Sequence, residues 1–367
     1  MKSKEKKDPK NMRSGYTTGA CATAATKAAL IALITKEIQI KSTITLPIGK
    51  VVTFKVEECV ITPSFAYAKI IKDAGDDPDA TDGATIVSTV RFLQEKGVVL
   101  DGGFGVGRVT KPGLPVSIGE AAINPVPRKM LRQIVAEVCE THKVNKGVSV
   151  KISVPEGVQM AEKTLNGRLG ILHGISILGT RGIVVPFSTS AYKASVVQAI
   201  KVAKLSGCNH IVLATGGRSE KYAMELYPNL QEEAFVEMGD FVGFAVRACK
   251  KQGIKKITLS GMMGKFSKVA QGVMMVHSKS APVDFNFLTE LAKKAGVSGE
   301  LLDKVQAANT ASQVGSLMQE ADVPQFFDLL CEACSNSCIE YAGEGLSIET
   351  VITTLKGQLL GRKVIHG

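Results

Sequence analysis

The residues best suited to binding an anion lie near the start of the chain. There SGYTTGACATAATKAA (residues 14–29) carries hydroxyl groups and glycines into an alanine-rich stretch. Small side chains leave the first N–H groups of a helix uncovered, and these groups bind anions together with the helix dipole. A core helix capped by Thr17 or Thr18 has the same pattern. Thr17, Thr18 and Gly19 are therefore candidates for an anion site, with a capped core helix as the alternative.

A second group of candidates follows apolar stretches in the second half of the chain, at residues 188–190, 215–218, 237–240 and 260–264. In an open α/β sheet, ligands bind beyond the carboxyl ends of the strands. Gly216 and Gly217 would let the backbone approach a ligand, and an acidic residue about 20 positions on can bind ribose hydroxyls. Glu237, which ends its strand, and Asp240 are the acidic candidates. The glycine fingerprint is incomplete, and glycines after a strand are also typical of plain turns.

Three basic residues could move a proton or hold a carboxylate. His277 lies in VHSKSAPVD (residues 276–284). It could act as a general base or orient a substrate, and a purely structural histidine fits equally well. Arg128 and Lys129 come at the expected start of a helix, where positive charge opposes the dipole. Their placement therefore favours binding of an anion.

Carboxylates and thiols cluster at two places. Residues 76–82 carry four aspartates, which could bind Mg²⁺ or a hydroxylated ligand, or form a solvated turn. EF-hand spacing is absent, so we predict no metal there. Cys331, Cys334 and Cys338 recur at helical spacing without a further ligand nearby. This spacing favours a buried helix face over a metal site.

The first half of the chain predicts an α+β scaffold for these residues. Alternating runs at 44–46 and 51–56 flank the turn at 47–49 and predict a hairpin. Further expected elements are strands at 66–72, 86–90 and 148–154 and a helix at 128–141. We expect residues 14–180 to form an α+β substrate domain.

From residue 182 onward, strands and helices alternate. The expected strands are 182–187, 210–214, 233–238 and 257–259, and the expected helices include 191–206, 241–252 and, last, 348–359. This alternation predicts a Rossmann-like parallel α/β domain over residues 181–367, ending in helices. The fold class is therefore mixed α/β with two domains, divided near residue 180.

Length and composition narrow the class of protein. A chain of 367 residues is longer than one ordinary hydrophobic core accommodates, which favours two domains. The sequence has no run of about 18 uncharged apolar residues, so we expect no membrane span. Residues 1–13 are basic and polar, which predicts a disordered tail and no secretion signal. The eight cysteines are then expected to be reduced in a cytoplasm. A net charge of +11 without tryptophan favours a polycarboxylate or phosphate partner over nucleic acid.

Six segments, in order along most of the chain, together resemble the CbiD family. They are GYTTGACATAA (15–25), AGDDPDATDG (74–83), GVGRVTKPGLP (105–115), AINPVPR (122–128), GISILGTRGIV (174–184) and VHS (276–278).

The resemblance implies a cobalt-precorrin-5B methyltransferase of anaerobic cobalamin biosynthesis. Such an enzyme transfers a methyl group from S-adenosylmethionine to carbon 1 of an anionic tetrapyrrole and gives cobalt-precorrin-6A. Cobalt enters only as part of the substrate. On this hypothesis the donor site takes Gly216, Gly217, Glu237 and Asp240. The substrate carboxylates take Thr17, Thr18, Gly19, Arg128 and Lys129, and His277 orients the substrate or handles a proton.

Two other functions are compatible with parts of the sequence. A nicotinamide-dependent oxidoreductase could use the same half-sheet, but the incomplete glycine fingerprint opposes it. A non-enzymatic carrier of tetrapyrrole or nucleic acid would fit the basic charge, but no groove-reading element is present. A homo-oligomer is left open by the sequence.

Overall fold

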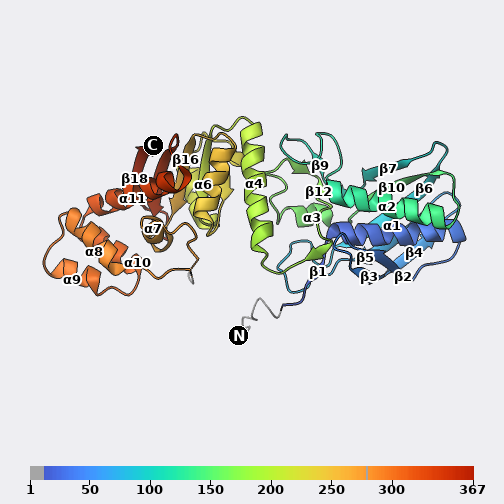
Figure 1. Ribbon diagram of the computed structural model, residues 1–367, viewed down its shortest axis with the longest axis horizontal. Coiled ribbons are helices and arrows are strands. Elements are labelled where there is room, and N and C mark those ends of the chain that lie inside the picture. Colours follow the sequence, from blue (N-terminus) through green and yellow to red (C-terminus); the bar gives the residue numbers. More distant parts are fainter. Residues whose placement is uncertain (1–11, 278–279) are drawn as a thin grey trace. The chain divides into compact units, whose positions relative to one another are not determined.

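The computed structural model describes residues 12–277 and 280–367, which form two compact units (Figure 1). Unit 1 ends at Ser188, and unit 2 runs from Thr189 to Gly367. Both units combine helices with a sheet, so the predicted mixed α/β class is confirmed.

Unit 1 is built on a five-stranded, mostly antiparallel sheet. Only the β10–β7 pair is parallel. The strand order is β4 (Glu58–Ile61), β5 (Ala66–Ile71), β6 (Thr85–Leu93), β10 (Gly147–Ser153) and β7 (Val98–Gly102). Three of these strands match the predicted ones, whereas β4 and β7 are not predicted. The hairpin is confirmed as β2 (Lys41–Thr45) paired with β3 (Val51–Lys55).

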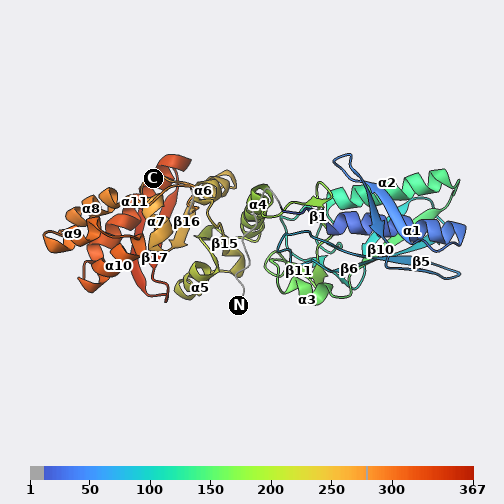
Figure 2. The same cartoon turned by 90° about the horizontal axis from the view of Figure 1, so that it is seen from below.

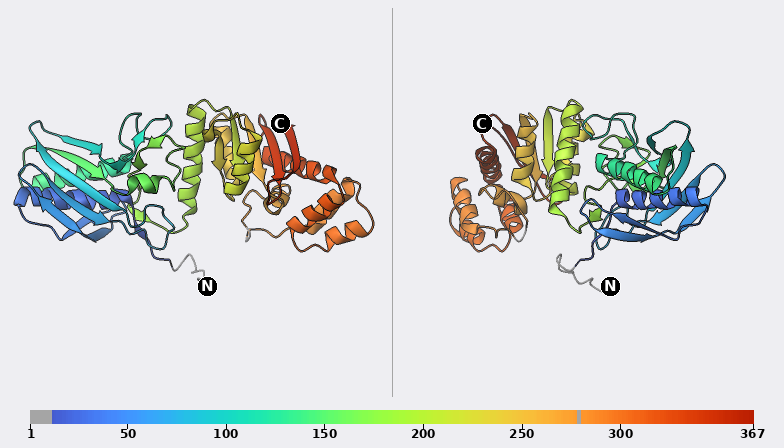
Figure 3. Two further views of the ribbon diagram at one scale, coloured as in Figure 1. Left: turned by 180° about the vertical axis from the view of Figure 1, so that it is seen from behind. Right: turned by 45° about the vertical axis from the view of Figure 1, so that its right-hand side comes forward.

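Two helices, α1 (Thr18–Thr35) and α2 (Pro125–Thr141), lie side by side in unit 1, and α1 packs on β5 and β6 (Figure 3). Because α1 consists largely of alanine and threonine, its backbone approaches its neighbours closely. A Cβ on Gly19 would come within 2.7 Å of Pro127 Cγ. Among the described residues, α1 alone has the length and hydropathy of a membrane span, and 78% of it is buried inside the protein. Burial in the core therefore accounts for its apolar character.

Three pairs of two-residue strands connect the remaining loops of unit 1. The pairs are β1 (Gly15–Tyr16) with β13 (Ile183–Val184), β8 (Gly105–Val106) with β12 (Gly174–Ile175), and β9 (Arg108–Val109) with β11 (Ile171–Leu172). The short helix α3 (Gly157–Ala161) lies between β10 and β11 in the chain. The strand predicted at 182–187 to begin the second sheet is therefore wrong. Only two of its residues form a strand, and this strand pairs with β1, close to the start of the chain.

Arg13, the last residue of the predicted N-terminal tail, has contacts within unit 1. Residues 1–11 lie outside the described part of the chain. Arg13 pairs its guanidinium with the Asp73 carboxylate, and its N–H donates to Asp76 Oδ2 at 2.8 Å. Arg13 thus contacts carboxylates about 60 residues away along the chain, and the disorder of the tail stays a prediction.

Unit 2 contains the predicted parallel sheet. Its strand order is β15 (Phe235–Glu237), β14 (His210–Ala214), β16 (Lys256–Gly261), β17 (Ser347–Thr353) and β18 (Leu359–His366). The first four strands are parallel, and β18 joins as an antiparallel edge. A 3₁₀ turn (Glu232–Ala234) replaces the first residues of the strand predicted at 233–238.

Helices cover both faces of this sheet. Figure 2 shows α5 (Gly217–Leu226) and α6 (Val242–Lys251) on opposite sides of it, as right-handed crossovers in opposite directions require. The remaining helices are α4 (Thr189–Leu205), α7 (Met263–Val269), α8 (Phe285–Lys294), α9 (Glu300–Gln306), α10 (Ala311–Glu320) and α11 (Pro324–Ala342).

The helix predicted at 348–359 is wrong, because this segment contains β17, a turn and the first residue of β18. The stretch is rich in β-branched residues, and six of the seven residues of β17 are buried. A strand buried on both faces shows no alternation of polar and apolar residues, so its pattern resembles that of a buried helix.

Candidate functional site

The edge of the unit 2 sheet where β14, β15 and β16 end is the natural place for a ligand. From β14 the chain passes to β15 on one side, and from β15 it returns across β14 to β16 on the other side. The direction of the strand order therefore reverses between β14 and β16. Ligands of doubly wound sheets bind beyond the carboxyl ends of the strands at such a switch point. The candidate loops predicted at 215–218, 237–240 and 260–264 all follow these three strands.

A cleft of about 400 Å³ opens at this switch point. Its volume lies in the range of small-molecule sites. The lining comes from the β14–α5 loop, the first turn of α5, the start of α7 and one residue of α10: Thr215, Gly216, Gly217, Arg218, Ser219, Met262, Gly264, Lys265 and Ser312. Both predicted glycines thus line the cleft.

Three glycines of this cleft have no structural need to be glycine. No heavy atom lies within 4 Å of the position a Cβ would take on Gly216, Gly217 or Gly264. None of the three has a left-handed φ; that of Gly216 is 161°, which is extended backbone. The absent side chains leave open space beside the backbone, as close approach of a ligand requires.

Lys265 links the three loops, and the sequence did not single it out. Its Nζ donates to the backbone oxygen of Thr215 at 2.7 Å and lies 3.1 Å from Asp240 Oδ1. Asp240, a predicted donor-binding residue, is therefore engaged by a lysine of the cleft. The signal in the sequence was the loop at 260–264, which places the next residues at the same edge.

Glu237 ends β15 with its side chain exposed, outside the residues that line the cleft. The hydroxyl of Tyr192, on α4, donates to its backbone oxygen at 3.3 Å. Burial raises the pKa of Tyr192 to about 12, and the negative charges of Glu237, Asp240 and Glu220 add to this shift. Carboxylates therefore gather around Tyr192 next to the end of β15, and Tyr192 is a further residue that the sequence did not single out.

His277 is exposed and follows a segment anchored to the β15 loop. The N–H of Val276 donates to the backbone oxygen of Asp240 at 2.9 Å. The backbone oxygen of His277 accepts from Lys268 Nζ at 3.3 Å. Ser278, the last residue of the predicted motif, lies outside the described residues. His277 does not line the cleft, and its catalytic role stays a prediction.

Thr17, Thr18 and Gly19 are buried at the start of α1, where each has partners within unit 1. Thr17 caps the helix by accepting from the N–H of Ala20 at 3.3 Å. The N–H of Gly19 donates to the backbone oxygen of Leu178 at 3.0 Å, and Thr18 Oγ1 accepts from the N–H of Leu178 at 2.9 Å. These contacts describe the capped core helix, and a direct role in binding an anion stays a prediction.

Arg128 is also engaged locally. Its Nε donates to the backbone oxygen of Ile123 at 2.7 Å, and its Nη2 donates to that of Ala121 at 3.1 Å. These bonds tie the start of α2 to the loop before it and give the positive charge a structural reason. Lys129 is exposed. The predicted substrate residues thus belong to unit 1 and the predicted donor residues to unit 2.

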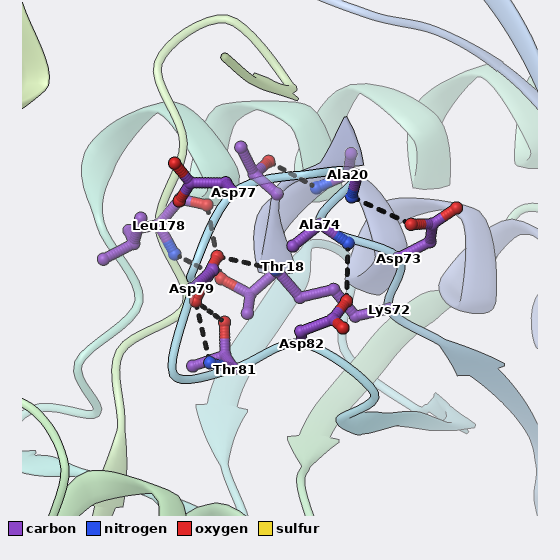
Figure 4. A network of polar contacts seen from close by, with 12 residues as sticks. Thr18, Ala20, Lys72, Asp73, Ala74, Asp77, Asp79, Thr81, Asp82 and Leu178 are labelled. Carbon is purple, nitrogen blue, oxygen red and sulfur yellow. Dashed lines mark hydrogen bonds and ion pairs between the residues drawn. The ribbon is translucent and has the colours of Figure 1, made fainter. Parts of the chain in front are cut away.

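The acidic loop of unit 1 is held by hydrogen bonds within the unit (Figure 4). Lys72, with a side chain only 1% exposed, donates to Asp79 Oδ2 at 2.7 Å. Burial alone would raise the pKa of Asp79, but Lys72 and Thr81 outweigh it, and the pKa lies below its usual value. Asp82 accepts from the N–H of Ala74 at 2.8 Å. The described residues contain no group of three or more acidic, histidine or cysteine residues able to hold a metal.

Cys331, Cys334 and Cys338 are fully buried on α11, as the interpretation of a buried helix face predicts. Cys334 Sγ donates to the backbone oxygen of Phe266 at 3.1 Å. Burial raises the pKa of all three thiols, so they are protonated at neutral pH.

The sequence matches two family descriptions, "CbiD" over residues 5–186 and "CbiD, C-terminal domain" over residues 275–364. A protein of Priestia megaterium called cobalt-precorrin-5B C(1)-methyltransferase is 63% identical over 98% of both chains. One of Leptospira interrogans serovar Lai with the same name is 43% identical over 96% of both. The crystal structure of a cobalamin biosynthesis protein (cbiD) from Archaeoglobus fulgidus is 24% identical over 85% of both chains, with a TM-score of 0.39.

Proposed function

Because this chain belongs to the CbiD family, we propose that it methylates carbon 1 of cobalt-precorrin-5B, with S-adenosylmethionine as methyl donor, to give cobalt-precorrin-6A. The observation that carries this proposal is the similarity to relatives with that named activity. The identity is 62–63% over 97–98% of the chain and extends through both units.

The residues of the unit 2 cleft fit a nucleoside donor. Gly216, Gly217 and Gly264 leave open space beside the backbone, and the cleft lies at the switch point of the sheet. Glu237, at the end of the neighbouring strand, can accept hydrogen bonds from ribose hydroxyls. Asp240 reaches the donor through Lys265, with which it pairs.

Methyl transfer needs little acid–base catalysis by the protein. Bound in the cleft, S-adenosylmethionine supplies a methyl group activated by a sulfonium. Carbon 1 of the macrocycle forms the new C–C bond while the S–CH₃ bond breaks and its electron pair stays on sulfur. The protein's residues must therefore align the two partners and exclude water. His277 is the residue we propose to orient the macrocycle or take up its proton.

The substrate is an anion with several carboxylate arms, which suits a chain with a net charge of +11. Of the five residues proposed for these arms, Lys129 is exposed and available for a direct contact. Thr17, Thr18, Gly19 and Arg128 fix the starts of α1 and α2 and so position the surrounding loops. We place the enzyme in the cytoplasm, with neither nucleic acid nor a membrane as partner.

The test measures both products of one turnover. The purified chain is incubated with S-adenosylmethionine and cobalt-precorrin-5B, and S-adenosylhomocysteine is quantified against methylated macrocycle. We expect equal amounts of the two, and neither product when the macrocycle or the chain is left out. Release of S-adenosylhomocysteine without macrocycle, or a macrocycle that gains no methyl group, would contradict the proposal.

A further inference from the structure

The switch-point cleft of unit 2 has an uneven charge. Its lining includes the cations Lys265 and Arg218 and contains no carboxylate. Asp240 is paired with Lys265, and Glu237 ends the strand on the far side of β14. A cleft of this kind favours an anionic group, with the acidic residues lying to one side of it.

Lys265 is held in place for such a contact. Its ammonium has three N–H donors; it donates to the Thr215 backbone oxygen at 2.7 Å and lies in an ion pair with Asp240 at 3.1 Å. The side chain is 36% exposed and lines the cleft, so the third donor is available to a ligand. A lysine fixed by two partners loses little side-chain entropy when it binds a third, and its bond to a carboxylate is charge-assisted.

We propose that Lys265 binds the amino-acid carboxylate of the methyl donor, so that the donor lies with this carboxylate at the β14–β16 cleft and its ribose toward Glu237 on β15. This inference rests on the function proposed above and names the residue that sets the donor's orientation. Lys265 Nζ lies beside the loops that follow β14 and β15, since it contacts Thr215 and Asp240, and Glu237 ends β15 three residues before Asp240. The amino-acid carboxylate and the ribose hydroxyls lie at different ends of the donor, so one bound donor can contact both Lys265 and Glu237.

The cleft also has the right size for the amino-acid end of the methyl donor. Its volume of about 400 Å³ suits an amino acid joined to part of a nucleoside, and the flat macrocycle is much larger. Gly216, Gly217 and Gly264 leave the backbone accessible next to Lys265. The macrocycle nevertheless carries carboxylates of its own, so the test must separate the two sources of this group.

The experiment compares two ligands that differ in the amino-acid part. S-Adenosylhomocysteine carries the carboxylate, and 5′-methylthioadenosine lacks the amino-acid end. Their dissociation constants are measured by calorimetry for the unchanged chain, Lys265→Met and Lys265→Gln. We expect both variants to bind S-adenosylhomocysteine about tenfold or more weakly, because a charge-assisted hydrogen bond is lost, with 5′-methylthioadenosine unaffected. Lys255→Met, an exposed lysine before β16, is the matched control and should change neither constant.

Each other outcome has a defined meaning. The inference is wrong if the variants bind S-adenosylhomocysteine in preference to 5′-methylthioadenosine as strongly as the unchanged chain does. It is equally wrong if the affinity for both ligands falls by the same factor, because Lys265 then does not bind the carboxylate. It is also wrong if donor binding is unchanged and only the KM for the macrocycle rises, because the cleft then takes a substrate carboxylate. If the unchanged chain binds neither ligand, the donor site of the proposed function fails before the role of Lys265 is reached.

Discussion

Single residues at the end of β15 and the start of α7 determine the chemistry of the candidate site. Thr215 and Asp240 come from the loops after β14 and β15, Lys265 comes from the first turn of α7, and its ammonium group contacts both. Glu237, three residues before Asp240, has an exposed side chain, and its backbone oxygen accepts from the Tyr192 hydroxyl. This division separates a cation that can bind a carboxylate from an acid that can bind hydroxyls.

Glu237→Gln tests the acid. We expect the affinity for S-adenosylhomocysteine to fall about tenfold, because a hydrogen bond to a charged acceptor contributes about 1.5–3 kcal/mol. The midpoint of thermal denaturation should not move, since the side chain is exposed. Glu225→Gln, on the exposed side of α5, makes the same charge change and should bind normally. Equal affinity of Glu237→Gln and the unchanged chain would remove Glu237 from the donor site.

Site residues could be predicted from the sequence where the adjacent residues form a recognisable strand. Gly216 and Gly217 follow an apolar strand, and Glu237 ends the next one. Lys265 and Tyr192 were missed because their partners lie 50 and 45 residues away along the chain. Only the fold brings such pairs together, and a lysine or tyrosine on a helix has no local pattern that distinguishes it.

At the scale of elements, the start of α5 distinguishes a ligand site from a plain turn. Gly217→Ala adds a methyl group where no atom lies within 4 Å. Stability should stay the same or rise by up to about 1 kcal/mol, because alanine favours a helix more than glycine does. Binding of S-adenosylhomocysteine should weaken, because the methyl group enters the cleft. Calorimetry and thermal denaturation measure the two effects. Gly167→Ala, also without nearby atoms but in unit 1, should affect neither.

The loop after β5 depends on one buried ion pair. Lys72→Met leaves Asp79 without its cation, and removing one partner of a buried pair costs about 3–5 kcal/mol. Lys69→Met, three residues earlier, removes a half-exposed partner of Glu58 and should cost less than about 1 kcal/mol. Denaturant unfolding of both variants measures the difference. Equal effects would mean that the pair at Lys72 does not anchor the loop.

Elements with a clear period were predicted well, and those without one were not. The hairpin β2–β3 and the helices α2, α4 and α6 agree with their patterns to within a few residues. Residues 348–359 were assigned to a helix because the buried strand β17 alternates in neither burial nor polarity. Residues 182–187 were given to the wrong sheet because β13 pairs with a strand near the start of the chain.

For the whole molecule, the pH dependence of stability should show the titration of His210. Burial lowers the pKa of His210 from 6.5 to about 4, helped by Lys256 and Arg362 and opposed by Glu349. The unfolded chain therefore binds a proton at a higher pH than the folded one. The stability from this residue is complete above about pH 6.5 and is lost as the pH falls toward 4.

Allowing for partial exposure, we expect a loss of about 1–2 kcal/mol across this window. Denaturant unfolding at several pH values measures it, and His210→Gln should flatten the curve there. The carboxylates with lowered pKa, such as Asp79 and Glu349, act at lower pH, because their stabilisation is lost only as pH falls through their folded pKa values. A curve that is equally steep in the variant would contradict the assignment to His210.

The two-unit organisation could be predicted from the length of the chain and from the alternation of strands and helices that begins near residue 182, and the family could be predicted from six motifs along most of the chain. The geometry of the site was not, since it depends on the reversal of strand order between β14 and β16.

The most direct test of the central claim is the position of the transferred methyl group. Cobalt-precorrin-5B is incubated with the chain and S-adenosylmethionine labelled with CD₃, and the product is fragmented in a mass spectrometer. We expect one CD₃ group per macrocycle, bound at carbon 1 and present only with active chain. A label on another ring carbon, or no label although substrate and donor are both intact, would contradict the proposed activity.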